Sequence, residues 1–147
     1  NANLYYANLY GTTYLYGANL DHADMRKVRL MNADLTKASL RNTDLRESHF
    51  GNTIFIEANL TNANLERASM PSADLRGADL SNANLSDADF SNANLEGANL
   101  SGAKLNGTSF KKANLTKATL TDAITEDADF SDAKILNIIG VDPGTLR

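Results

Sequence analysis

The side chains best suited to acid–base or metal chemistry near neutral pH are two histidines, His22 and His49. Neither has a partner at a spacing that implies a metal site or a pair of nucleophile and base. The chain contains no cysteine, which excludes disulfides, thiolate nucleophiles and thiolate-bound metals. These residues give no support to catalysis. We therefore expect a protein that is not an enzyme, with no catalytic residue, no cofactor and no metal site.

Asp and Asn side chains are abundant, and oxygen ligands of this kind could suggest calcium. The glycine-rich nonapeptide pattern of calcium-binding β-helices is missing, however. A glycine-rich phosphate loop is missing too, because Gly77, Gly97, Gly102 and Gly107 recur at one position of a repeat, where they fit turns. We attribute the many amides and hydroxyls to ladders along the outside of a repetitive structure.

A five-residue repeat must position all of these side chains. An apolar residue falls at every fifth position from Leu15 to Ile135, with Thr125 as the exception. Two residues before each of these 25 centres stands a small residue, Ala in 19 cases, so the unit is Ala-(Asp/Asn)-Leu-x-x. This period fits neither the 3.6 residues of a helix nor the 2.0 of a strand. Units this short bury their apolar residues only by stacking on neighbours, which predicts a solenoid.

Three copies of the repeat carry a family resemblance: Ala78-Asp79-Leu80, Ala83-Asn84-Leu85 and Ala93-Asn94-Leu95. They resemble the pentapeptide-repeat family, and the resemblance covers nearly the whole chain. It implies an all-β fold, a right-handed quadrilateral β-helix of about six to seven square coils with four pentads each. The central residue and the small residue before it would point inward. The resemblance also implies a bacterial, often cyanobacterial, source, and leaves the cytoplasm, the periplasm and the thylakoid lumen open as locations.

Folding the sequence at twenty residues per coil, as the resemblance implies, sorts the central residues into columns that form the predicted core. One column contains Leu20, Leu40, Leu60, Leu80, Leu100 and Leu120. Another contains Leu30, Phe50, Met70, Phe90, Phe110 and Phe130. The last three rings fall on successive rungs, and a rung spacing of about 4.8 Å suits offset stacking.

We expect one domain made of a repeat over residues 1–135 and a capping segment over residues 136–147. The repeat has an irregular step at residues 10–14, where six residues separate Leu9 from Leu15 and Gly11 can supply an unusual backbone angle. After Ile135, an apolar segment ends in a turn signal and is predicted to fold over the last coil. The chain starts inside the repeat and without Met, so we expect the natural start to lie upstream.

The pair Ile124 and Thr125 breaks the pattern, because an apolar residue precedes the only polar centre. A local shift of register would turn Ile124 inward and Thr125 outward, and no buried hydroxyl would then lack a hydrogen-bond partner. The sequence therefore predicts an irregular coil at this point.

Exposed apolar side chains are expected on one face near the N-terminus. All five tyrosines lie within the first 16 residues. The inferred register places Tyr14 and Tyr16 outward on the same face as Ile54 and Ile56, at positions that are otherwise polar. A protein partner uses such residues, and so does a local cover over the first coils. These four residues are the candidate partner surface.

Charge patterning gives no strong lead. The net charge is -4, and no apolar run approaches the roughly eighteen residues of a membrane span. The N-terminal third is locally basic, with Arg26 and Arg46 in one column as a like-charge contact, but nearby acids dilute it, so we expect no nucleic-acid binding. Acidic residues cluster near the C-terminal end, between Asp122 and Asp132.

The function favoured by the sequence is a non-enzymatic structural scaffold or protein-interaction module, with a protein partner of unknown identity. Unpaired backbone at the ends of a solenoid also leaves open a homodimer by end-to-end contact. The alternative follows from the family resemblance, since some members mimic duplex DNA and bind type II topoisomerases, with protection or inhibition of gyrase. Such a mimic needs negative potential along the rod, and a net charge of -4 with a basic and an acidic end argues against it.

Overall fold

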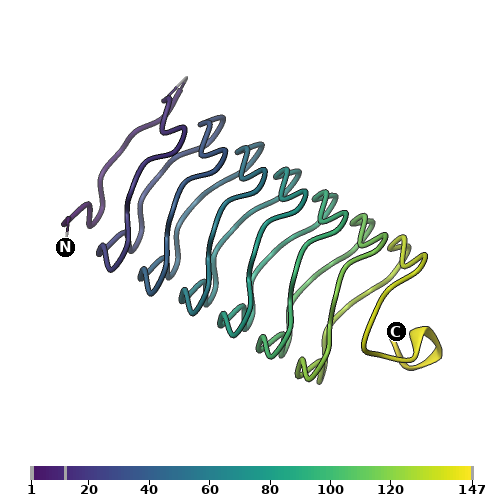
Figure 1. Cartoon of the computed structure of the whole chain (residues 1–147). Coiled ribbons are helices and arrows are strands. Elements are labelled where there is room, and N and C mark those ends of the chain that lie inside the picture. Colours follow the sequence, from purple (N-terminus) through teal and green to yellow (C-terminus); the bar gives the residue numbers. More distant parts are fainter. Residues whose placement is uncertain (1, 12, 147) are drawn as a thin grey trace.

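The fold is a rod of square coils stacked along one axis, with the termini at opposite ends (Figure 1). It is defined by a computed structural model that describes residues 2–11 and 13–146. Residues on neighbouring coils pair in parallel at a separation of twenty, as Asp24 does with Asp44 and Ser39 with Asn59. The chain is the right-handed quadrilateral β-helix that the sequence predicts.

Four faces form the sides of the rod, and each contains seven paired residues among those that the structure describes. We name each face by one of its central residues. The paired residues run from Tyr14 to Lys134 on the Leu15 face and from Asn19 to Ile139 on the Leu20 face. They run from Asn3 to Ile124 on the Met25 face and from Asn8 to Asp129 on the Leu30 face. Pairing occurs at isolated bridges, because the chain turns after every pentad. Within the described ranges the one helix is the 3-10 helix η1, Pro143–Thr145.

Each corner of the square is a turn made by the two residues after the central one. The second of them has a positive φ, for example 58° at Lys27 and 57° at Arg67. This conformation costs an ordinary residue roughly 1 to 2 kcal/mol. Hydrogen bonds to the next coil offset the cost, since the N–H of Lys27 donates to the carbonyl of Arg46 at 3.0 Å. Within the turn, the N–H of Ala68 donates to the carbonyl of Leu65 at 2.9 Å.

The Asp or Asn before each central residue closes the turn from outside. Its side-chain oxygen accepts the N–H two residues on, as Asp34 does from Thr36 at 2.9 Å and Asn59 from Thr61 at 3.0 Å. This Asx turn matters because the backbone ladder gives that corner N–H no partner among the described residues. The repeat Ala-(Asp/Asn)-Leu therefore encodes a hydrogen bond as well as a packing pattern.

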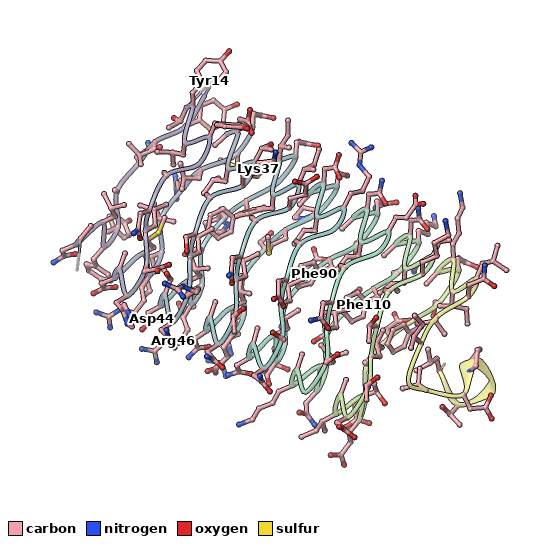
Figure 2. All side chains as sticks on the ribbon, in the orientation of Figure 1. Tyr14, Lys37, Asp44, Arg46, Phe90 and Phe110 are labelled. Atoms are coloured by element: carbon pink, nitrogen blue, oxygen red, sulfur yellow. The ribbon has the colours of Figure 1, made fainter. Side chains whose placement is uncertain are left out.

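The core is a continuous column of the inward side chains. The members of the predicted leucine column that have no exposed surface are Leu40, Leu60, Leu80, Leu100 and Leu120. Leu20 is only partly buried, because it lies in the first coil. Phe50 is fully buried, and the rings of Phe90 and Phe110 stack with centroids 5.6 Å apart inside the rod (Figure 2). Phe110 and Phe130 continue the stack at 5.1 Å.

Hydroxyl side chains replace the small inward Ala at four buried positions: Thr43, Ser48, Thr53 and Thr108. Each hydroxyl donates to the carbonyl of a central residue on the preceding coil. Ser48 bonds Met25 at 2.7 Å, and Thr108 bonds Leu85 at 2.7 Å. A buried hydroxyl is thus accommodated wherever it can donate a hydrogen bond to a carbonyl of the preceding coil.

The irregular step near the N-terminus adds one residue to the first coil. Asn8 pairs with Arg29, 21 residues on, whereas Tyr14 pairs with Asp34, 20 residues on. Gly11 has a φ of 112°, which favours glycine. The hydroxyl of Thr13 closes the step by donating to the carbonyl of Leu9 at 2.9 Å. Residue 12, within the predicted step, lies outside the described residues.

The register shift predicted at Ile124 is wrong. Ile124 stays outward with 48% of its surface exposed, and it pairs with Lys104. Its N–H donates to Ala103 at 2.9 Å and its carbonyl accepts from Leu105 at 2.8 Å, so a shift would break two ladder bonds. Thr125 lies in the last full coil and is only half-buried, so its hydroxyl is not withdrawn from water.

The backbone pairing runs past Ile135, because Ile139 pairs with Thr119. The chain leaves the ladder at Gly140, where φ is 89° and a Cβ atom would collide with Thr121. The side chain of Asp142 then accepts the N–H of Gly144 at 2.9 Å and starts η1. Two residues of the segment, Thr145 and Leu146, face the last coil across a cavity whose other lining residues are Thr125, Asp127, Ala128 and Phe130. This placement suits the capping role, which stays a prediction.

We expect Thr108→Val to lower the free energy of unfolding by about 1 kcal/mol, because it removes the hydroxyl bonded to Leu85. Val fits the site, since Val28 occupies the same repeat position and is fully buried. Urea denaturation measures the change. The matched control is Thr116→Val at a corner, where the hydroxyl makes no hydrogen bond among the described residues. Equal stability of the two variants would contradict this role of the hydroxyl.

We expect Gly140→Ala to release residues 141–146 from the end of the rod, because the new methyl group collides with Thr121. The control is Gly97→Ala, where φ is 68° but nothing lies within 4 Å, so backbone strain alone costs about 1 to 2 kcal/mol. Urea denaturation reports the loss of stability, and amide hydrogen exchange at Thr145, whose N–H donates to the carbonyl of Asp142 at 2.9 Å, reports release of the segment. If the Thr145 amide exchanges equally slowly in both variants, the tight turn at Gly140 does not hold the segment.

Candidate functional site

The four residues of the candidate partner surface lie on the Leu15 face, and we call them the tyrosine–isoleucine patch. Tyr14 and Tyr16 are 78% and 63% exposed, Ile54 is 37% exposed and Ile56 is half-buried. Tyr14 pairs with Asp34, which in turn pairs with Ile54. The tyrosines and isoleucines are therefore two rungs apart, or about 10 Å.

The patch breaks the hydrogen-bonding rule of the repeat. Tyr14 and Ile54 occupy the position where Asp or Asn caps the turn, and in the described chain the N–H groups of Tyr16 and Ile56 have no partner. Asp34, on the rung between them, does accept a hydrogen bond from the N–H of Thr36. Departures from local consistency that bring no packing gain are expected at functional positions. Other outward positions without Asp or Asn lose this hydrogen bond as well, since in the described chain the N–H groups of Met31, Gly51 and Asn106 also have no partner. The patch differs from them because large apolar side chains take the Asp or Asn position twice on one face, which makes it the strongest candidate site.

Charged groups surround and divide the patch. Hydrogen bonds from the hydroxyl and N–H of Thr36 hold the pKa of Asp34 below its usual range, so this carboxylate stays ionised at neutral pH. Lys37 forms an ion pair with Glu57 at 3.6 Å on the adjoining corner, and Figure 2 shows Tyr14 and Lys37 on the same side of the rod. An apolar centre with a polar rim is the usual composition of a protein interface.

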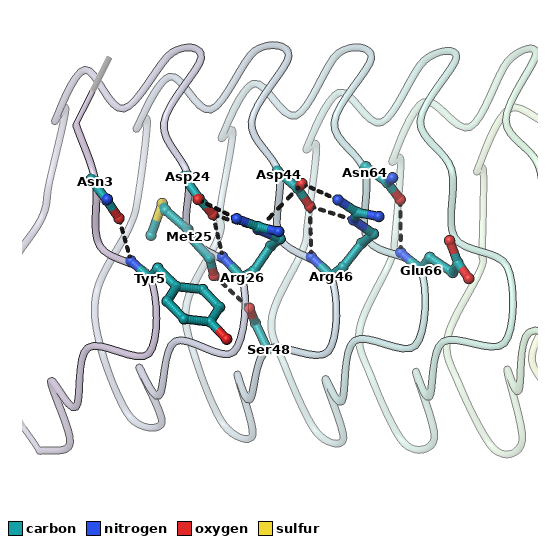
Figure 3. A network of polar contacts seen from close by, with 10 residues as sticks. All are labelled: Asn3, Tyr5, Asp24, Met25, Arg26, Asp44, Arg46, Ser48, Asn64 and Glu66. Carbon is teal, nitrogen blue, oxygen red and sulfur yellow. Dashed lines mark hydrogen bonds and ion pairs between the residues drawn. The ribbon is translucent and has the colours of Figure 1, made fainter.

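The opposite face, the Met25 face, contains a ladder of paired charges (Figure 3). Arg26 binds Asp24 at 2.7 Å and approaches Asp44 at 3.7 Å, and Arg46 binds Asp44 at 2.6 Å. The like-charge contact expected between Arg26 and Arg46 is therefore bridged by Asp44. Burial raises the pKa of Asp44, but hydrogen bonds from Arg46 outweigh it and lower that pKa overall.

Other exposed charges near the N-terminus are also paired. Side-chain hydrogen bonds from Arg41 and Ser39 lower the pKa of Asp21 to about 2. Lys27 lies 3.5 Å from Glu47 along the adjoining corner. Exposed pairs of this kind stabilise a protein by only about 0.2 to 1 kcal/mol each. Their main effect is to neutralise the locally basic N-terminal third.

Residues suited to catalysis are not brought together. His22 is exposed at a corner of the Leu20 face, and His49 is exposed on the Leu30 face, across the rod. Across residues 2–11 and 13–146, no group of three or more His, Asp or Glu side chains is placed to hold a metal ion. Within the same ranges, no helix has the length and apolar character needed to cross a membrane.

Two features of the surface escaped sequence reasoning. The guanidinium of Arg26 lies 5.1 Å from the ring centroid of Tyr5, a cation–π contact between neighbouring coils. Three apolar residues, Ile124, Leu136 and Ile139, are 48%, 67% and 55% exposed near the C-terminal end. The repeat register places each of them at an outward position, so an inspection of outward positions alone would have found them.

The sequence matches profiles of a known protein family. A family profile described as pentapeptide repeats in eight copies matches residues 13–52, and one described as a pentapeptide repeat region matches residues 43–120. A search of curated proteins gives no match.

Solved structures agree. HetL, a pentapeptide repeat protein involved in heterocyst differentiation regulation in the cyanobacterium Nostoc sp. strain PCC 7120, is 33% identical; the match covers 99% of this chain and 75% of HetL with a TM-score of 0.65. The pentapeptide repeat protein alr5209 of Nostoc is 26% identical over 84% of each chain, with a TM-score of 0.50. A trypsin-treated variant of QnrB1, a plasmid-mediated fluoroquinolone resistance protein, is 20% identical over 94% of this chain and 76% of its own, with a TM-score of 0.52, and shares the fold.

The profile matches, the identity to HetL over nearly the whole length and the square coils lead to one conclusion. The chain belongs to the pentapeptide-repeat family.

Proposed function

We propose that this chain is a non-enzymatic protein-interaction module that binds a protein partner through the tyrosine–isoleucine patch. One observation carries the proposal: large apolar side chains, Tyr14 at 78% and Ile54 at 37% exposure, take the place of the polar residue that Asp34 supplies on the rung between them. Exposed aromatic and β-branched side chains at positions that are otherwise polar are typical of a surface that contacts another protein.

The chemistry of the patch defines the partner that it fits. Apolar side chains about 10 Å apart would cover the tyrosines and isoleucines, and a Lys or Arg between them would meet the carboxylate of Asp34. The backbone of the face is a rigid ladder, so binding orders few groups on this side. A protein with a flat apolar surface interrupted by one cation satisfies both conditions.

The relatives support a binding role over a catalytic one. HetL is involved in regulation of heterocyst differentiation, and its likeness extends over nearly the whole of this chain. We extend this reasoning to the present chain and assign it a regulatory or scaffolding contact with another protein.

The distribution of charge argues against a DNA mimic. The coil formed by residues 103–122 contains four lysines and one acid, and it separates two acidic coils. The coil of residues 23–42 is also net basic. Duplex DNA presents one negative charge per roughly 1.7 Å without such interruptions.

We expect Ile54→Asn to separate folding from binding. The new amide oxygen can cap the N–H of Ile56, which should raise the free energy of unfolding by about 0.5 to 1 kcal/mol in urea denaturation. The same change removes an apolar contact from the patch. For a partner identified by photo-crosslinking from position 16, the dissociation constant should rise about tenfold or more.

The matched control for this experiment is Asn94→Ile, the reverse exchange at the same repeat position of the same face, two rungs beyond Ile54. It should lower stability, because Asn94 caps the N–H of Glu96 at 3.2 Å, and leave binding unchanged. A partner that binds the Ile54→Asn protein with undiminished affinity would rule out the patch as its site.

In a supercoiling assay with purified DNA gyrase, we expect near-stoichiometric amounts of the chain neither to inhibit the enzyme nor to protect it from a quinolone. The basic coils interrupt the negative potential that a DNA mimic requires. Clear inhibition or protection would reverse the ranking of the two functions.

A further inference from the structure

We propose that the Leu30 face contains a binding site for a phosphate group. Its hydrogen-bond donors are the side chains of Arg29 and His49 and the backbone N–H groups of Met31 and Gly51. These residues lie on neighbouring rungs, because Arg29 pairs with His49. The site is on a different face from the tyrosine–isoleucine patch and is independent of the function proposed above.

Two backbone N–H groups on this face lack the acceptor that the repeat normally supplies. Further along the same face, the side chain of Asp89 accepts the N–H of Ser91 at 2.9 Å. An arginine and a histidine take the place of that acid two residues before Met31 and Gly51, whose N–H groups have no partner in the described chain. Adjacent rungs are about 4.8 Å apart, so one tetrahedral anion can accept hydrogen bonds from both groups.

The chain itself shows how an oxyanion fills such a position. On the Leu20 face Ser39 replaces the usual Asp or Asn, and the carboxylate of Asp21 accepts the N–H of Arg41 at 2.9 Å instead. The guanidinium of Arg41 and the hydroxyl of Ser39 donate to the same carboxylate at 2.7 and 2.6 Å. Arg26 and Asp24 repeat the combination of corner N–H, guanidinium and carboxylate (Figure 3). An oxyanion therefore binds where a corner N–H and a guanidinium are available together.

The side chains of the site are available to an anion from outside the chain. Arg29 and His49 are exposed, and Arg29 is the one arginine among those that the structure describes that forms no ion pair. Lys27, on the adjoining corner, is paired with Glu47 at 3.5 Å. The outward positions of the face contain no acid before Asp89. The site thus keeps an uncompensated positive charge.

The arrangement of donors suits one phosphate group. Two N–H groups lie on the wall of the rod, while a guanidinium and an imidazole extend from neighbouring rungs. A phosphate monoester offers three terminal oxygens to donors that approach from several directions, and a carboxylate offers two. The next cation at an outward position of this face is Lys111, three rungs beyond His49. The face therefore does not follow the backbone of a nucleic acid, in which charges are closely spaced.

The test is a titration of the chain with inorganic phosphate at constant ionic strength, followed by ¹⁵N NMR. The amides of Met31 and Gly51 should shift together and reach saturation. Asn106 is the internal control, because its N–H also lacks a partner in the described chain and follows a cation at Lys104. There the acid Glu126 lies 3.4 Å from the side chain of Asn106, so phosphate should be repelled. The absence of saturable shifts, or an equal response at Asn106, would overturn the proposal.

Variants separate the contributions of the side chains and the backbone. Arg29→Gln should raise the dissociation constant for phosphate about fivefold or more, because it removes charge-assisted hydrogen bonds. His49→Asn should abolish the response of the Gly51 amide, because the new amide oxygen can accept that N–H within the chain. Lys104→Gln removes a cation at the same repeat position of another face and should leave the affinity unchanged. Circular dichroism checks that all three variants are folded, and unchanged affinity in Arg29→Gln would refute the site.

Two further ligands define the form of the anion. Tighter binding of O-phosphoserine than of inorganic phosphate would support a phosphomonoester on another molecule, and the reverse order would support the free anion. Acetate should bind more weakly than either. If acetate shifts the amides of Met31 and Gly51 with the same affinity as phosphate, the site does not select phosphate and the proposal is wrong.

Discussion

The structure depends on the hydrogen-bonded register between coils. Every twenty residues the chain must return its N–H and carbonyl groups to within bonding distance of the coil before, as Ser39 and Asn59 show. A pentad that was longer or shorter would put all later side chains on the wrong column. The single extra residue of the first coil is absorbed where few contacts precede it, and the buried columns begin after that point.

The five-residue period, together with the twenty-residue coil that the family resemblance implies, was enough to predict the columns of the core. The stack from Phe90 to Phe130 follows from those columns. The register at Ile124 could not be predicted in the same way. Side-chain preference alone favours burying an isoleucine, but two backbone bonds hold Ile124 outward. The strength of the ladder is a property of neighbouring coils that the local sequence does not contain.

The candidate site was only partly visible in the sequence. The register places Tyr14 and Ile54 outward on one face, so their exposure could be predicted. The hydrogen bonds that the two residues forgo could not, because the capping role of Asp and Asn becomes clear only when Asp34 is seen to accept the N–H of Thr36. Other outward positions also lack this hydrogen bond, so the functional argument depends on the exposed apolar side chains themselves.

The corners of the rod have a wider consequence. Lys, Glu, Arg, His and Ser adopt nearly the same positive φ there as Asn and Asp, with values between 54° and 65°. The path of the backbone is therefore insensitive to which residue stands at an outward corner. Side chains at outward positions can therefore be exchanged one by one, while the spacing of about 4.8 Å between equivalent positions on neighbouring coils stays constant. In a molecule of this kind, substitutions on the surface can change which partner is bound without changing the backbone that holds the binding residues in place.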